Sequence, residues 1–425
     1  MGRIAIVEGI RTPFVKAWTL FEDIPAQALG TIVVRELLEI THLDPDTVDE
    51  VIFGAVAQPV EASNVARVIA LYAGMPKGKR AYTVSRNCAS GLESVTSASE
   101  KIRTGLDEIV IAGGTESMSN IPLIFGKEIT KIFLKLNKAK SSIEKLKLFA
   151  SMRPSHFKLV AGLALGLSDP VCGLNMGQTA EVLAKEFGIT RREQDEFSLM
   201  SHKRAIVNRM KLREEIVPVF VPPNYDIVVE DDNGPRENQT MEALCSLKPY
   251  FDRHTGTVTV GNSCQVTDGA CALLVMEEEK ARELGYEPLG YIRAYSYIGL
   301  EPSKMGLGPA FSIPLVLNKA GLKLKDIDLI EINEAFATQV LACVRALASK
   351  KFAQDNFSMS EPIGEIDMAK LNVNGGAIAL GHPVGTSGSR LVLTLLKEMK
   401  RRSAKLGLAS LCVGGGQGGA IILER

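Results

Sequence analysis

The sequence predicts an α/β fold made of two similar halves. Short apolar segments typical of strands alternate with amphipathic segments typical of helices along most of the 425 residues. A short turn that leads into a strand occurs twice, at residues 43–54 and at residues 322–333. In each half a later strand runs into a glycine cluster, at residues 113–114 and at residues 414–416. We therefore expect two copies of one α/β unit, a mostly parallel sheet, and helices packed between the halves.

The first half supplies most of the recognisable elements. Strands are expected at three short apolar runs: residues 4–7, 50–53 and 108–112. Helices are expected at three amphipathic segments: residues 26–39, 64–73 and 92–104. Asn64 is a candidate N-cap of the second helix. Further along, residues 176–203 predict a helical stretch and the polar residues 224–243 predict a long surface loop.

A basic segment interrupts the repeat. Residues 121–158 contain nine Lys or Arg but only two acidic residues. The apolar side chains of its first part have helical spacing and form a stripe: Ile129, Ile132, Phe133 and Leu136. A second helix is expected near Ile143, Leu146 and Phe149. Two interpretations stay open. The stripe packs on its own domain with a solvated basic face, or the helix docks on a membrane surface or a partner.

Composition excludes several classes of protein. Lys plus Arg is 49 and Asp plus Glu is 49, so we expect no nucleic-acid partner. The seven cysteines form no CxxC pair, which argues against a disulfide framework or a metal site and favours a reducing, cytoplasmic location. No apolar run reaches the ~18 residues that span a bilayer. The first residues read directly as a strand, so no signal or transit peptide is expected.

Two cysteines lie in contexts that suit thiol chemistry. Cys88, in SRNCASGLESV, precedes a predicted helix, whose dipole and free N–H groups would lower the thiol pKa. Cys412, in SLCVGGGQGGA, precedes glycines whose N–H groups could bind an oxyanion. The alternatives are a small buried hydrophobic residue at Cys88 and a core cysteine at a strand end at Cys412.

Two further polar residues lie in comparable places. His382 is surrounded by the glycines of NVNGGAIALGHPVGTSGSR, where the backbone can approach a ligand closely. Asn333, in EINEAFA, follows a strand, a position where open α/β sheets contact ligands. The alternatives are a tight turn with an incidental histidine, and N-capping by Asn333. Together the four residues predict an acyl-transfer site with a thiolate nucleophile, a base, a second thiol and oxyanion donors.

At this point the sequence resembles the thiolase family. The resemblance covers essentially the whole chain and rests on seven blocks: NCASG, AGGTESMS, MGQTAE, GNSCQVTDGA, NEAFA, NGGAIALGHPVGTSG and CVGGGQG. It implies a five-layered αβαβα fold of two similar halves with an inserted loop domain, and a homo-oligomer. The implied parts are residues 1–120 with 248–284 as the first half, 121–247 as the loop domain with the basic insert, and 285–425 as the second half.

The resemblance also implies roles for the motif residues. Cys88 is implied to be the nucleophile that carries the acyl group as a thioester, and His382 to activate it and hold the thioester oxygen. Cys412 is implied to be the proton donor and acceptor. Asn333 would hold a water in one oxyanion hole, while the backbone N–H groups of Cys88 and Gly414 would form the other. Candidate substrate contacts are Ser263, Cys264, Met176 and Arg204; coenzyme A and acyl-CoA are the expected substrates, and no tightly bound cofactor is expected.

Departures within the motifs indicate the subtype. Short-chain biosynthetic members have histidine where this chain has Asn175 and serine where it has Cys264, whereas residues 136–149 and 247–259 resemble the thiolase subunit of the fatty-acid oxidation trifunctional complex. That subunit usually has histidine at Asn333. The expected activity is degradative cleavage of 3-ketoacyl-CoA in β-oxidation. The alternatives are a biosynthetic acetoacetyl-CoA thiolase and a non-enzymatic lipid-binding scaffold. Residues 121–158 would then meet a hydratase/dehydrogenase subunit or a membrane periphery.

Overall fold

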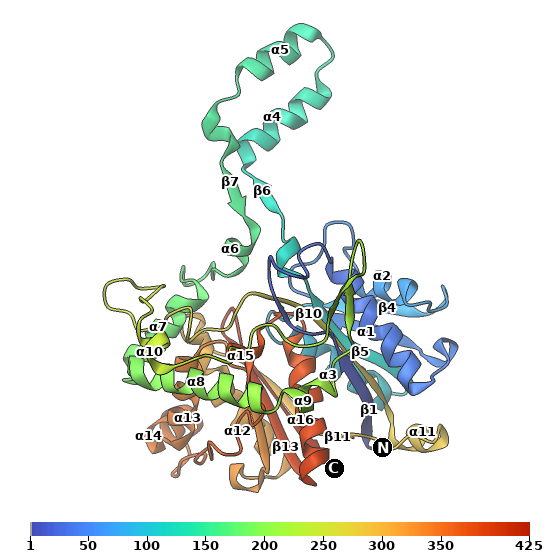
Figure 1. Cartoon of the computed structure of the whole chain (residues 1–425), viewed down its shortest axis with the longest axis vertical. Coiled ribbons are helices and arrows are strands. Elements are labelled where there is room, and N and C mark those ends of the chain that lie inside the picture. The colour runs from blue at the N-terminus through green and yellow to red at the C-terminus, as the bar shows by residue number, and fades with distance from the viewer. Residues whose placement is uncertain (1) are drawn as a thin grey trace. The chain divides into compact units, whose positions relative to one another are not determined.

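The computed structural model describes residues 2–425 and separates them into two units (Figure 1). Unit 2 is the continuous segment Ile121–Ser168, and unit 1 combines the chain before and after it. The division into three parts expected from the sequence stays a prediction. Each unit is described by itself below.

Unit 1 contains one ten-stranded mixed sheet. The strands follow the order β12-β13-β14-β11-β1-β10-β5-β3-β4, with the short β2 paired to β10. The first-half strands are β1 (Ile4–Arg11), β2 (Val15–Lys16), β3 (Glu50–Gly54), β4 (Arg80–Val84), β5 (Ile109–Glu116) and β10 (Thr267–Glu277). The second-half strands are β11 (Gly290–Gly299), β12 (Leu329–Ile332), β13 (Leu406–Val413) and β14 (Gln417–Glu424). The two halves join where β1 pairs with β11.

The expectation of a mostly parallel sheet is wrong. Parallel pairs join only β3 to β4 and β5, and β12 to β13, while the remaining pairs are antiparallel. The parallel pairs are the repeated βαβ units, which need a helical crossover. β14 instead follows β13 through a tight glycine turn, and β10 runs against both β1 and β5.

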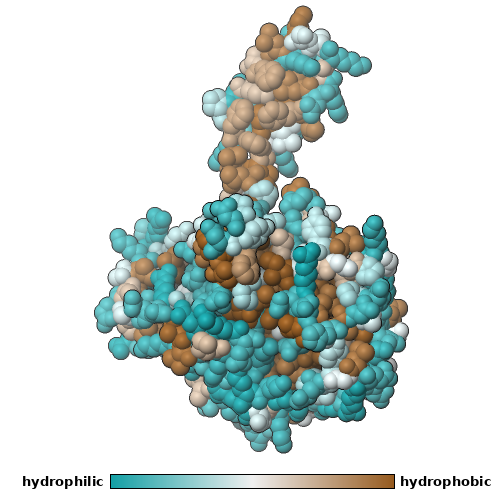
Figure 2. Space-filling model, turned by 45° about the vertical axis from the view of Figure 1, so that its right-hand side comes forward, coloured by the Kyte–Doolittle hydropathy of each residue, from teal (hydrophilic) through white to brown (hydrophobic). Residues whose placement is uncertain are grey.

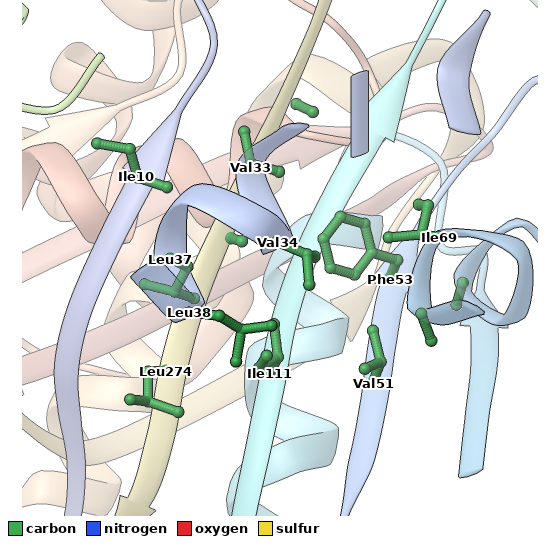
Figure 3. Close-up of a cluster of buried hydrophobic side chains, with 14 of the residues drawn as sticks. Ile10, Val33, Val34, Leu37, Leu38, Val51, Phe53, Ile69, Ile111 and Leu274 are labelled. Atoms are coloured by element: carbon green, nitrogen blue, oxygen red, sulfur yellow. The ribbon is translucent and has the colours of Figure 1, made fainter. Parts of the chain in front are cut away.

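Helices form three layers around the strands. α1 (Ala26–Thr41) and α2 (Val65–Tyr72) cover the outer face of the first half, and α12 (Gly308–Ala320) and α13 (Ala337–Ala348) cover that of the second. α3 (Ser90–Arg103) and α16 (Ser387–Arg402) pack on each other between the two sets of strands. In the outer core of the first half, Val34, Phe53 and Ile111 belong to one cluster of buried hydrophobic side chains, with Val34 next to the Phe53 ring (Figure 3). The expected αβαβα layering and the two similar halves are confirmed.

The predicted elements of the first half are confirmed, and Asn64 caps α2 by accepting the backbone N–H of Arg67. The helical stretch at residues 176–203 instead divides into α7 (Met176–Glu186) and α8 (Arg191–Val207), because Gly188 takes a left-handed φ of 59° and Thr190 caps α8. The other helices of unit 1 are α9 (Arg209–Arg213), α10 (Met241–Cys245), α11 (Glu278–Glu283), α14 (Lys350–Phe357) and α15 (Ala377–Leu380).

The polar segment at residues 224–243 is only partly a surface loop. It contributes β9 (Ile227–Val229), which pairs with β8 (Val219–Val221). Asp232 is buried and accepts two hydrogen bonds from the guanidinium of Arg11, at 2.6 and 2.8 Å. The segment therefore anchors the end of β1, which its polar composition did not indicate.

Unit 2 is a small helical segment on a two-stranded ribbon. β6 (Leu123–Phe125) pairs with β7 (Leu159–Ala161), and the helices are α4 (Lys127–Lys138), α5 (Ser142–Ala150) and α6 (Gly162–Gly166). α4 packs on α5, with Ile129 and Leu136 buried, whereas Phe133 is 45% exposed. Hydrophobic residues also gather on the surface of this unit (Figure 2). Among residues 2–425, no helix is both long and apolar enough to cross a membrane.

Candidate active site

The Cys88 turn lies between β4 and α3 and is tied to the glycine turn that follows β13. Asn87 takes a left-handed φ of 43°, and its side-chain amide donates to the carbonyl oxygen of Gly414 at 2.8 Å. In return the backbone N–H of Gly414 lies close enough to the Cys88 thiol to lower its pKa. The two turns that contain the predicted nucleophile and oxyanion donor therefore hold each other in place.

Burial raises the pKa of the Cys88 thiol, although the backbone N–H groups of Gly414 and of Cys88 itself act in the opposite direction. The expectation that a helix N-terminus would lower this pKa is therefore wrong for the free protein. Cys88 lies two residues before α3 begins at Ser90, and the cost of desolvating a thiolate outweighs the N–H groups. Cys88 thus needs a base to remove its proton.

His382 lies in the turn between α15 and α16 and is buried. Its backbone N–H donates to the Thr267 hydroxyl at 3.1 Å, and Nδ1 lies 2.5 Å from the Ser387 hydroxyl. Nε2 lies 3.4 Å from the side-chain amide of Asn333. Burial, with a smaller contribution from the nearby Arg390 guanidinium, lowers the pKa of His382 to about 3. The imidazole is therefore neutral at physiological pH and can accept a proton.

Asn333 follows β12 and is fully buried. Its backbone N–H donates to the Ser410 carbonyl at 2.9 Å, but its side-chain oxygen has no hydrogen-bond partner among residues 2–425. A buried carbonyl oxygen of this kind normally binds a water or a ligand. The alternative of N-capping is wrong, because α13 begins at Ala337 and its N-cap residue is Phe336.

Cys412 lies one residue before the end of β13 and is only 1% exposed. Burial raises the pKa of its thiol well above the ordinary value, and the neighbouring Cys88 and Cys264 raise it further. A thiol that stays protonated until a reaction demands its proton suits a proton donor. The Cys88, Cys343 and Cys264 thiols thus all lie near Cys412.

The four candidate substrate contacts differ in their surroundings. Cys264 is half-buried near the other thiols, and the Met176 sulfur would lie 3.3 Å from a Cβ atom placed on Gly414. The Ser263 hydroxyl instead donates to the Thr259 carbonyl at 2.7 Å. The Arg204 guanidinium donates to the carbonyls of Leu371 and Met368, at 2.5 and 2.8 Å. These main-chain contacts give Arg204 a structural task, and its role in substrate binding stays a prediction.

Two buried glutamates hold the site together and were not identified from the sequence. The Glu116 carboxylate accepts backbone N–H groups of Val56, Ala57 and Gly385, at 3.1, 2.9 and 2.8 Å, which fixes the turn after His382. Glu334, next to Asn333, accepts from three groups: the Ser201 hydroxyl, the Asn372 amide and the Ile378 N–H. The signal was available, because both acids lie inside otherwise small or apolar motifs, AGGTES and NEAFA.

Glycines allow α3 and α16 to cross in backbone contact next to the site. A Cβ atom on Gly388 would lie 2.2 Å from the backbone nitrogen of Leu92, and one on Gly91 would lie 2.9 Å from the Gly385 carbonyl oxygen. Cys88 precedes α3 and His382 precedes α16. The close crossing therefore sets how the turns that contain the predicted nucleophile and the predicted base lie relative to each other.

Comparison with known proteins gives matches over nearly the whole chain. Residues 4–279 match the thiolase N-terminal domain and residues 286–425 the thiolase C-terminal domain. The chain is 43% identical to a 3-ketoacyl-CoA thiolase of Pseudoalteromonas translucida, covering 99% of this chain and 97% of that protein. It is similar to the Bacillus anthracis acetyl-CoA acetyltransferase (TM-score 0.87, 36% identity, 100% and 99% coverage). It is also similar to human mitochondrial 3-ketoacyl-CoA thiolase in complex with CoA (TM-score 0.85, 35% identity, 100% and 98% coverage).

Proposed function

The chain belongs to the thiolase family, and on that premise we propose that it is a degradative 3-ketoacyl-CoA thiolase that works through an acyl group on Cys88. The enzyme is an acyltransferase: it transfers the acyl group of a 3-ketoacyl-CoA to coenzyme A and releases acetyl-CoA. The thiolases of three other bacteria, each 42–43% identical over 99% of this chain, have the same name.

In the first half-reaction the Cys88 sulfur attacks the C3 carbonyl carbon while its proton passes to neutral His382. The tetrahedral oxyanion then collapses and the C2–C3 bond breaks, which leaves the acyl group on Cys88 as a thioester. The electron pair leaves as the enolate of acetyl-CoA, and Cys412 protonates its C2 carbon. N–H groups of Cys88 and Gly414 stabilise one oxyanion, and a water on Asn333 together with His382 stabilises the thioester oxygen.

In the second half-reaction coenzyme A replaces acetyl-CoA in the site. Its thiol returns a proton to the Cys412 thiolate, and its sulfur attacks the acyl carbon on Cys88. The shortened acyl-CoA leaves, and Cys88 recovers its proton from His382. Transfer between two thiols needs little driving force, because a thioester is broken and another is formed.

One observation carries this proposal: the reciprocal contact between the two turns of the site. Asn87 binds the Gly414 carbonyl, while the Gly414 N–H points to Cys88. Gly414 is also only two residues beyond Cys412 in the chain. The nucleophile, an oxyanion donor and the second thiol therefore come together through a few backbone contacts, as a two-step acyl transfer needs.

Coenzyme A is the proposed co-substrate, and Cys264 and Met176 are the better-placed candidate contacts for it. We also propose a homo-oligomer. β4 is an end strand whose outer edge pairs with no strand among residues 2–425, and exposed strand edges favour pairing with another chain. Unit 2 is proposed to contact an anionic membrane surface, with a hydratase/dehydrogenase subunit as the alternative.

Biosynthetic condensation is a second candidate, favoured by the similarity to the Bacillus anthracis acetyl-CoA acetyltransferase. The two activities run the same steps in opposite directions. They differ in the acyl chain that the site accepts and in the preferred direction.

A thiolysis assay with 3-ketoacyl-CoA substrates of four and sixteen carbons tests the proposal. We expect cleavage of both, and an acyl adduct on the protein by intact mass when CoA is withheld. Cys88→Ala should abolish the adduct, while Cys245→Ala, which removes an exposed thiol, should keep it. A stable acyl adduct on Cys88→Ala would contradict the assignment of the nucleophile, and cleavage of the four-carbon substrate alone would favour the biosynthetic alternative.

A further inference from the structure

The two ring nitrogens of His382 have different and fully buried partners. Nδ1 lies 2.5 Å from the Ser387 hydroxyl oxygen, and Nε2 lies 3.4 Å from the side-chain nitrogen of Asn333. Ser387 and Asn333 are 0% exposed and His382 is 6% exposed, so bulk water does not compete for these nitrogens. We propose that Ser387 is a positioning residue that keeps His382 in the tautomer with the proton on Nδ1 and the lone pair on Nε2.

The hydroxyl of Ser387 has a single proton, and that proton has another acceptor. Ser387 is the first residue of α16, and its Oγ donates to the carbonyl oxygen of Pro383, four residues earlier, at 3.0 Å. A carbonyl oxygen can only accept, so the hydroxyl must be the donor in that contact. With the hydroxyl donating to Pro383, the Ser387 oxygen is left as an acceptor toward His382, and Nδ1 carries the proton.

The contact on the other side of the ring leads to the same assignment independently. The side-chain nitrogen of Asn333 is a donor only, so its partner Nε2 must present a lone pair. In the opposite tautomer Nε2–H would face the Asn333 donor, and Ser387 could donate to Nδ1 only by giving up its hydrogen bond to the Pro383 carbonyl. Ser387 and Asn333 therefore favour the same tautomer of His382 from opposite sides of the ring.

This inference rests on the proposed function, in which Nε2 takes the Cys88 proton. A neutral imidazole can serve as a base only at its unprotonated nitrogen, and a histidine held in the wrong tautomer retains its position but loses its task. Ser387 does not need to touch the substrate for this role. Its effect reaches the reaction through the ring of His382.

A nuclear magnetic resonance measurement on histidine labelled with ¹⁵N tests the tautomer without any turnover. The chain has only five histidines, and a His382→Asn sample identifies the His382 signals. We expect wild-type His382 to carry its proton on Nδ1, and Ser387→Ala to shift the ring toward the Nε2–H form or to a mixture. A wild-type signal from Nε2–H would overturn the proposal.

Ser389→Ala is the matched control, because Ser389 is equally buried on the same turn of α16, but its hydroxyl donates to the Thr386 carbonyl, at 2.8 Å, and has no hydrogen bond to His382 among residues 2–425. We expect Ser387→Ala to lower kcat for thiolysis by about 10²-fold, the size of a general-base contribution, with a small change in KM. Ser389→Ala should stay within about threefold of wild type and keep the wild-type tautomer.

The outcomes separate this inference from the proposed function. An active wild-type enzyme with an unchanged tautomer and full activity in Ser387→Ala would remove Ser387 from its role and leave the thiolase assignment intact. Equal losses in Ser387→Ala and Ser389→Ala, with no change of tautomer, would indicate a purely structural role and also overturn it. A wild-type protein without thiolase activity would refute the proposed function, while the tautomer measurement would still decide the arrangement around His382.

Discussion

The thiols of the site differ in what they must do with a proton. In the proposed reaction Cys88 loses its proton, whereas the buried Cys412 gives one to a carbanion and recovers it. We predict that Cys412→Ala still forms the acyl adduct on Cys88, since the nucleophile and His382 remain. Exchange of the acetyl-CoA methyl protons with deuterated solvent should disappear, because no base remains at that carbon. Deuterium uptake by mass spectrometry measures this, with Cys245→Ala as control; normal exchange in Cys412→Ala would contradict its role.

Glu116 predicts a pH dependence of stability. Burial raises its pKa from 4.5 to about 7, against three backbone N–H groups. A carboxyl whose pKa is higher in the folded protein stabilises the fold fully below its unfolded pKa, and that stability is lost as the pH rises through about 7. The loss amounts to about 3 kcal/mol between pH 4.5 and pH 8.

Urea unfolding at pH 5 and pH 8 tests this expectation. Glu116→Gln should have a smaller difference in unfolding free energy between the two pH values than wild type, because it cannot ionise. Glu108→Gln, which removes an exposed carboxyl next to β5, is the control and should behave like wild type. The same pH dependence in Glu116→Gln and wild type would show that this carboxyl does not titrate as stated.

At this scale the sequence predicted residue types better than residue environments. Cys88, His382, Asn333 and Cys412 were chosen as candidates because each lies in an unusual local context that is visible in the sequence. The direction of the Cys88 pKa shift was not predictable, because it depends on how far burial in the folded protein outweighs N–H groups such as that of Gly414, more than 300 residues away in the chain. Ser387 was not identified either, since a serine among glycines carries no signal until its distance to His382 is known.

The crossing of α3 and α16 makes a prediction about packing. Gly388→Ala would place a methyl group 2.2 Å from a backbone nitrogen of α3, and a backbone cannot move aside as a side chain can. We expect a destabilisation on the order of 3 kcal/mol and a loss of kcat, because the helices would separate the Cys88 and His382 turns. Thermal unfolding and thiolysis measure the two effects. Gly78→Ala, where nothing lies within 4 Å, is the control, and an equal response of both variants would contradict the explanation.

The helices of unit 2 predict an electrostatic effect that leaves catalysis unchanged. Lysines of α4 lie beside apolar residues, and Leu146 and Phe149 of α5 are 70% and 57% exposed. A lysine near an anionic membrane contributes about 1 kcal/mol. Replacing four lysines with glutamine should therefore sharply reduce co-sedimentation with anionic liposomes. Turnover of a short soluble substrate should stay unchanged. The four residues are Lys127, Lys131, Lys135 and Lys138.

A matched set in unit 1 controls for net charge, because it removes the same number of exposed lysines: Lys77, Lys248, Lys350 and Lys351. Equal losses in the two sets would indicate a general charge effect. A wild-type protein that ignores liposomes but captures a hydratase/dehydrogenase subunit would favour the partner alternative. If the wild-type protein binds neither liposomes nor that subunit, the remaining explanation is a helix that packs within its own unit, which agrees with the burial of Ile129 and Leu136.

Helices and strands were predicted correctly where apolar strand segments alternate clearly with amphipathic helix segments. The prediction failed for the direction of strands, which depends on the strands they pair with. The repeated βαβ units were visible as similar sequence patterns, and their strands are parallel as expected. The directions of β10 and β11 depend on partners far away in the chain, and nothing local distinguishes a parallel from an antiparallel apolar strand.

In the whole molecule, the first strand has its partners in the middle of the chain. β1 pairs with β10 on one side and with β11 on the other, across separations of more than 250 residues. Its apolar side chains Ile4 and Ile6 are almost completely buried in the core shared by both halves. β1 therefore meets its partners only after more than 250 further residues have been made, and such long-range pairing folds slowly.

During synthesis, β1 has no partner strand until β10 and β11 have been made. Stalled nascent chains should leave residues 4–11 open to protease until β10 has emerged, and the segment should become resistant once β11 follows. Early resistance of that segment would contradict this order of events. A newly made chain thus exposes aggregation-prone apolar sequence until these strands pair. The chaperone capacity of the cell, rather than the final stability of the enzyme, would then set how much active protein accumulates.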